Sequence, residues 1–188
     1  MEQSDLLKFL CTHLQRVGIR YFITGSQATI AYGEPRFTND IDVVVDLDET
    51  TCEAFCDGFP PEDFYLNRDT ARQEVARQGM FNIIHPASGL KIDVIIPSQS
   101  SFDQQRFERG LPIAIAEDCT AIFSSAEDII LQKMTWHQAG GGERHLRDIQ
   151  GILKVRGEAL DRAYIEQQAR ELGVTDLWHE LARKASPG

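Results

Sequence analysis

Three aspartates in two short apolar segments are the residues best suited to chemistry. Asp40 and Asp42 stand one residue apart in TNDIDVVVD (38–46), and Asp93 lies within LKIDVIIP (90–97). Side chains alternate between the faces of a β-strand, so Asp40 and Asp42 should point the same way, about 7 Å apart at Cα. A buried, isolated carboxylate costs several kcal/mol, and a divalent ion would neutralise all three. Such oxygen ligands favour Mg²⁺ or Mn²⁺, which share their coordination with substrate phosphates.

Taken alone, a D-x-D pair in a strand is more often a solvated or salt-bridged edge than a metal site, and we expect Asp46 and Asp48 to be solvated residues at the strand end. The Gly25-Ser26 dipeptide changes this balance, because it follows the apolar run IRYFIT (19–24) and precedes the short helical segment QATIAY (27–32). Backbone N–H groups and a hydroxyl at a helix N-terminus attract anions, with help from the helix dipole. The sequence therefore pairs a phosphate-binding turn with metal-binding acids.

The chain has 188 residues and a formal net charge of −10. This excess of acidic over basic residues argues against a large nucleic-acid-binding surface, because such a surface needs clustered Lys and Arg. No apolar stretch approaches the roughly 20 residues that span a bilayer, and the N-terminus has no signal-peptide pattern. We therefore expect a cytoplasmic protein without membrane contact, whose four cysteines stay reduced.

Predicted helices and strands alternate along the first two thirds of the chain, and they must position these residues. Hydrophobic periodicity predicts an N-terminal helix with Ser4 as its N-cap and Gly18 at its end. Strands are expected over 19–24, 38–46, 80–86, 90–97 and 111–116, with a hairpin turn at 87–89. From Ser125 onward the pattern is helical. The expected class is α+β with a mixed sheet, divided into an α/β core over 1–124 and a helical portion over 125–188.

At these positions the chain resembles the nucleotidyltransferase superfamily with the DNA polymerase β-like fold. The pattern is a Gly-Ser turn opening a short helix, a D-x-D strand and a third acid on a neighbouring strand. The form G-x-P-R-x-T-x-D-I-D over 33–42 is similar to small stand-alone members, including AbiEii-type toxins and the lincosamide and aminoglycoside nucleotidyltransferases. The resemblance covers roughly residues 20 to 155, and its N-terminal half is the specific part.

The resemblance implies two Mg²⁺ or Mn²⁺ ions, bridged by Asp40 and Asp42, with Asp93 holding the catalytic one. Gly25 and Ser26 would then bind the β- and γ-phosphates of a nucleoside triphosphate. Two closely spaced ions stabilise both the entering and the leaving oxygen of a phosphoryl displacement.

Three further residues are candidates for nucleotide binding. Arg36, in the loop before Asp40, would contact phosphate or acceptor, or else pair with the acids and orient them. Lys133 resembles a lysine that these small transferases direct at the triphosphate; the alternative is a surface lysine paired with Glu127 or Asp128. Asp148 matches an acid in the helical region of toxin-like members and would support Lys133 or the acceptor, unless it forms an ordinary surface ion pair.

These features together predict an enzyme that moves a nucleoside monophosphate from a nucleoside triphosphate to an acceptor hydroxyl and releases pyrophosphate. The sequence does not decide whether the acceptor is an antibiotic, an RNA 3′ end or a protein side chain, although the negative net charge disfavours nucleic acid. A homodimer is compatible with this reading. The alternatives are a toxin–antitoxin-type binding or regulatory module with little turnover, and a metal-dependent glycosyltransferase that uses D-x-D.

Overall fold

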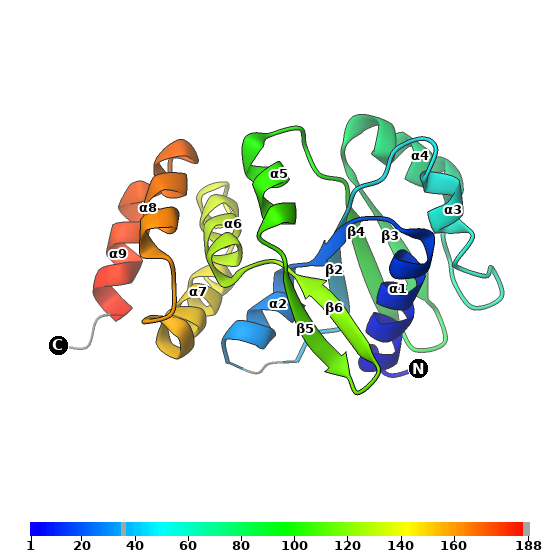
Figure 1. Cartoon of the computed structure of the whole chain (residues 1–188), viewed down its shortest axis with the longest axis horizontal. Helices are drawn as coiled ribbons and strands as arrows, with labels where there is room; N and C mark the ends of the chain where they lie inside the picture. Colours follow the sequence, from blue (N-terminus) through cyan, green and yellow to red (C-terminus); the bar gives the residue numbers. More distant parts are fainter. Residues whose placement is uncertain (35–36, 186–188) are drawn as a thin grey trace. The chain divides into compact units, whose positions relative to one another are not determined.

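Six strands form one mixed sheet in the computed structural model, which describes residues 1–34 and 37–185. The strand order is β3-β4-β2-β1-β6-β5 (Figure 1). β2 pairs in parallel with β4, and β1 pairs in parallel with β6; the other neighbouring pairs are antiparallel. The bounds are β1 Tyr21–Ile23, β2 Asp40–Val45, β3 Met80–His85, β4 Leu90–Ile95, β5 Leu111–Ala116 and β6 Cys119–Phe123.

One face of the sheet carries the hydrophobic core, because the central strands alternate in side-chain type. Ile41 and Val43 of β2 lie opposite Ile92 and Val94 of β4, and all four are fully buried. Burying such side chains stabilises the fold by about 1.5–3 kcal/mol each. The residues between them, including the aspartates, emerge from the other face.

Helices α1 (Gln3–Val17), α3 (Cys52–Cys56) and α4 (Arg68–Arg77) pack against one another and against the sheet (Figure 1). Phe55 of α3 meets Phe81 of β3 edge to face at 6.2 Å between ring centroids. Phe81 is the register partner of Val94. Because Val94 belongs to the apolar side of the sheet, α3 covers that side and leaves the acids on the other.

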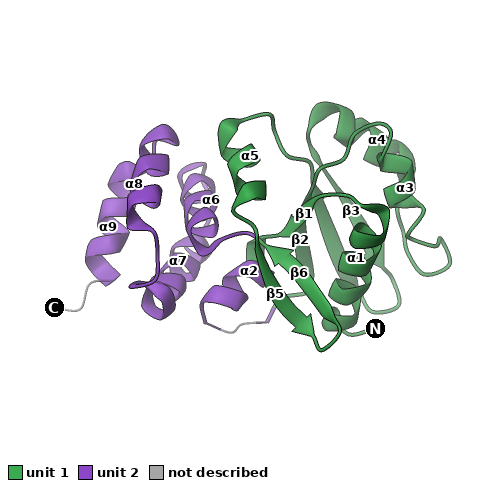
Figure 2. Ribbon diagram, viewed as in Figure 1, with its two compact units in different colours: residues 1–26, 38–123 green, residues 27–37, 124–188 purple. Residues whose placement is uncertain are grey.

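The chain separates into two units (Figure 2). The first contains residues 1–26 and 38–123, with the sheet and α5 (Ser101–Glu108). The second contains residues 27–37 and 124–188, with most of α2 (Gly25–Tyr32) and the helices α6 (Ala126–Gln138), α7 (Arg144–Arg156), α8 (Arg162–Glu171) and α9 (Thr175–Ala185). The division into domains over 1–124 and 125–188 stays a prediction.

The α+β class and the mixed sheet are confirmed, with differences in detail. The N-cap of α1 is Glu2, whose capping box with Asp5 replaces the expected Ser4 cap. Helix α2 begins at Gly25 itself rather than after the turn. Neither α5 nor β6 was expected from the sequence. No helix among the described residues is long and apolar enough to cross a membrane.

Candidate functional site

The structure brings the three predicted acids together on one face of the sheet. Asp40 and Asp42 lie on β2, and Asp93 lies on the adjacent parallel strand β4. Asp42 and Asp93 are direct register partners, and Asp40 lies opposite Lys91. Alternate residues share a face, so all three carboxylates and Lys91 emerge on the same side. Asp93 is nearly buried, whereas half of the Asp40 side chain is exposed.

The Gly25-Ser26 turn lies directly against Asp42. The backbone N–H of Ser26 donates to Asp42 Oδ2 at 3.3 Å, and the backbone N–H of Thr24 donates to the Asp42 carbonyl at 2.9 Å. Gly25 has a φ of +57°, and a Cβ at this position would lie 2.0 Å from Asp42 Oδ2. Only glycine allows this backbone to approach the carboxylate so closely. The turn therefore presents its helix N-terminus to a negatively charged oxygen.

Lys91 and Asn82 hold the third acid, and sequence reasoning missed both. The Lys91 ammonium lies 2.9 Å from Asp93 Oδ2 and 3.9 Å from Asp40 Oδ1. The Asn82 amide, on the antiparallel neighbour β3, donates to Asp93 Oδ1. The hydrogen bond to Asp93 raises the pKa of Lys91 above its ordinary value, and the negative charges of Asp40 and Asp42 act in the same direction, against partial burial.

The residue types at this site fit a divalent ion, but their side chains do not converge on one. Among the described residues, no group of three or more His, Cys, Asp or Glu side chains is arranged so that it could hold a metal ion. Carboxylates from adjacent strands on one face are suitable ligands for Mg²⁺. Here Asp42 accepts from the Ser26 N–H, while Asp93 accepts from Asn82 and Lys91. Metal binding by all three acids would require these contacts to change.

Arg106 is a buried cation beneath the turn, and it too was missed because α5 was not predicted. Its side chain is 3% exposed and lies over the ring of Phe22, 4.7 Å from the centroid. It donates to Thr24 Oγ1 at 3.3 Å and to Asp103 Oδ1 at 3.1 Å. Since Thr24 immediately precedes Gly25, this guanidinium helps to fix the start of the turn.

Two of the other predicted binding residues meet within the helical unit. Lys133 of α6 and Asp148 of α7 form an ion pair of 2.8 Å, and the residues are only 3% and 8% exposed. Both residues are therefore buried, so Lys133 is not a surface lysine and its pair with Asp148 is not a surface ion pair. Arg36, the remaining predicted binding residue, lies outside the described residues.

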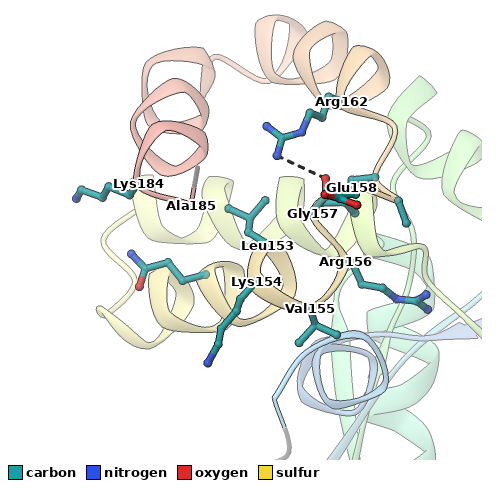
Figure 3. A pocket seen from close by; sticks show the side chains of 12 residues that line it. Leu153, Lys154, Val155, Arg156, Gly157, Glu158, Arg162, Lys184 and Ala185 are labelled. Atoms are coloured by element: carbon teal, nitrogen blue, oxygen red, sulfur yellow. Dashed lines mark hydrogen bonds between the residues drawn. The ribbon is translucent and has the colours of Figure 1, made fainter. Parts of the chain in front are cut away.

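The helical unit also carries an open groove of about 970 Å³ with basic side chains along its wall (Figure 3). Lys154 and Arg156 belong to the last turn of α7, and Arg162 donates to the Gly157 carbonyl at 3.5 Å. Cations at a helix C-terminus offset the partial negative charge of its free carbonyls. Lys154 and Lys184 also bond to carboxylates at 2.6 Å, on Glu34 and Glu180. The groove's basic residues are thus explained by local structure.

Comparisons with known proteins place this site in a known fold. No family model and no curated protein sequence matches the chain. Among solved structures, an antigenic nucleotidyltransferase-like protein from Paracoccidioides brasiliensis is similar, with a TM-score of 0.63 and 18% identity over 96% of this chain and 87% of the other.

The antibiotic-resistance factor ANT(2'')-Ia is also similar. Its solution structure gives a TM-score of 0.54 with 12% identity, over 95% of this chain and 97% of the other. Its structure with adenylyl-2''-tobramycin gives a TM-score of 0.52 with 13% identity, over 90% and 96%. At such identities the likeness establishes the architecture. With its mixed sheet and an acid-bearing β2 beside a Gly-Ser turn, the chain has the polymerase β-like nucleotidyltransferase fold.

Proposed function

We propose that the protein is a metal-dependent nucleotidyltransferase that moves a nucleoside monophosphate from a nucleoside triphosphate to a hydroxyl acceptor. One observation carries the proposal: the Gly25-Ser26 turn contacts Asp42, the register partner of Asp93. A phosphate-binding helix N-terminus and a pair of carboxylates thus adjoin on one face of the sheet. The nucleotidyltransferase fold of the chain supports the same reaction class.

Each residue of the turn and the acid cluster has a role in this proposal. The backbone N–H groups at the start of α2 and the Ser26 hydroxyl bind the β- and γ-phosphates, assisted by the helix dipole. Arg106 keeps the turn in place through Thr24. Asp40, Asp42 and Asp93 are the candidate ligands for Mg²⁺ or Mn²⁺. Such an ion, when bound, would offset the charge that develops on the phosphoryl oxygens.

The proposed reaction makes and breaks one bond at the α-phosphorus. The acceptor oxygen forms a new phosphoester bond, and the bond between the α-phosphorus and the oxygen bridging to the β-phosphorus breaks. Pyrophosphate leaves, and the acceptor proton passes to a carboxylate of the cluster or to water. The turn contributes by holding the triphosphate, so that the leaving pyrophosphate stays bound while the bond breaks.

The acceptor class is the open part of the proposal. A structure of the same fold contains an adenylylated aminoglycoside, and the net charge of −10 favours a cationic acceptor over a polyanion. Aminoglycosides therefore head the panel of acceptors to test, followed by RNA 3′ ends and protein hydroxyls.

The test measures label transfer from each of the four α-³²P-labelled nucleoside triphosphates, with Mg²⁺ or Mn²⁺, to this panel. We expect transfer and pyrophosphate release with at least one combination, and a loss of at least about a thousandfold in Asp42→Asn. Asp46→Asn is the matched control, because Asp46 follows the same strand and forms an exposed pair with Arg20 at 2.7 Å. It should retain activity.

Three outcomes would contradict the proposal. Equal activity in Asp42→Asn and wild type would show that the acids take no part in the reaction. Tight binding to a protein partner with no turnover of any triphosphate would favour the regulatory module. Transfer of label only from nucleotide sugars would favour the glycosyltransferase.

A further inference from the structure

Both carboxylate oxygens of Asp93 already have partners within the chain. The Asn82 amide donates to Oδ1, and the Lys91 ammonium lies 2.9 Å from Oδ2. Asn82 reaches Asp93 from β3, and Lys91 reaches it from two positions earlier on β4. Asp93 is also the most enclosed of the three acids.

The Lys91 ammonium lies close to carboxylates of both strands. It is 3.9 Å from Asp40 Oδ1 on β2 while it contacts Asp93 on β4. A divalent ion on the same Asp93 oxygen would come within a few ångströms of this positive charge and be repelled by it. Asp42 accepts a hydrogen bond from the Ser26 N–H at the start of α2.

We propose that Lys91 takes the place of the Asp93-bound ion, so that the site holds one divalent ion, on Asp40 and Asp42, together with the triphosphate. This inference rests on the proposed function and differs from the two ions that the sequence resemblance implies. In it, Asp93 orients Lys91, and the ammonium supplies a fixed positive charge beside the reacting phosphate. A lysine suits this position because its ammonium is compact and its stem is flexible.

The experiment counts bound Mn²⁺ by electron paramagnetic resonance, in which free Mn²⁺ gives a sharp signal that is lost on binding. The full chain is titrated in the presence of a non-hydrolysable nucleoside triphosphate analogue. Each analogue-bound chain of the wild type should bind one Mn²⁺ in total, which the triphosphate shares with Asp40 and Asp42, and Lys91→Met should bind two. Lys91→Arg, which keeps the charge, should bind one. Lys8→Met is the control, because it removes an exposed pair with Asp118 at 2.6 Å and should also bind one.

Two bound ions in wild type, or none, would overturn the inference, as would a single ion in a folded Lys91→Met. If Lys91→Met does not fold, the counts for wild type and Lys91→Arg decide, since two ions in either contradict the inference. Label transfer measured on the same samples separates the two proposals. Active wild type with two ions retains the proposed function and rejects the role of Lys91. Inactive wild type with one ion, rising to two in Lys91→Met, rejects the transfer reaction and supports the role of Lys91.

Discussion

Gly25 is the residue at which backbone conformation and site chemistry depend on each other. Its positive φ places it in the left-handed region, and its missing side chain leaves room for the Asp42 carboxylate. Any larger residue meets both a backbone penalty and a collision with a candidate metal ligand. Gly89 shares a positive φ, of +70°, but a Cβ added there would meet no atom within 4 Å. Substitutions at the two glycines can therefore be compared to separate the free-energy cost of the left-handed backbone from the cost of displacing Asp42.

We predict that Gly25→Ala lowers the free energy of unfolding by more than the about 1–2 kcal/mol expected for a left-handed backbone alone. It should also reduce kcat/KM for transfer by about a hundredfold, because the carboxylate is displaced by ångströms. Gly89→Ala should show only the backbone cost and keep its activity. Urea unfolding and initial rates measure both effects. Equal losses in the two variants would contradict the close approach of Gly25 to Asp42.

At the scale of elements, the α6–α7 pair is joined by the buried ion pair of Lys133 and Asp148. A buried pair adds little net stability relative to apolar residues, but the loss of one partner removes a close ionic contact from the buried charge that remains. The structure therefore gives Lys133 a packing role within the helical unit. Its expected role at the triphosphate stays a prediction, and the two roles respond differently to mutation.

We predict that Lys133→Met destabilises the protein by about 3–5 kcal/mol, as is typical when one partner of a buried pair is removed. Adding Asp148→Leu should recover much of this loss, because the carboxylate left behind is then removed as well. Chemical denaturation of both variants measures the coupling. If the double variant is stable but inactive, Lys133 has a role in transfer beyond packing. A double variant as active as wild type would contradict such a role.

At the scale of the whole molecule, the sheet unit has sources of stability other than a bound ion. The sheet unit is held by an apolar face that includes Ile41, Val43, Ile92 and Val94. The acids on the opposite face are already engaged by Lys91, Asn82 and the Ser26 N–H. Electrostatic repulsion within the cluster is therefore reduced without metal, even in a chain with a net charge of −10.

We predict that removing divalent ions with EDTA abolishes nucleotidyl transfer but lowers Tm by less than about 4 °C, which corresponds to roughly 1 kcal/mol for a chain of this size. Re-addition of Mg²⁺ should restore activity. Differential scanning calorimetry with and without EDTA provides the measurement. Unfolding on chelation would show that the acids need an ion for stability and would contradict the neutralisation of the cluster by Lys91 and its hydrogen bonding by Asn82.

Local patterns predicted much of the fold because hydrophobic periodicity and turn residues act over a few neighbouring positions. The hairpin of β3 and β4 and the Ser125 cap of α6 are as expected. Helix α5 was missed because its apolar periodicity is weak, and the strand β6 was missed as well.

The sequence by itself determined which residues are chemically suited to the site: the glycine and serine of the turn and the three aspartates. Their types and their alternation along strands depend only on local geometry. Only the tertiary structure decided that Lys91 and Asn82 engage Asp93, that Arg106 supports Thr24, and that Lys133 is buried against Asp148. Apart from the contact of Lys91 with Asp93, which lie two residues apart on β4, these contacts arise from strand order, register and helix packing, which join residues farther apart in the chain.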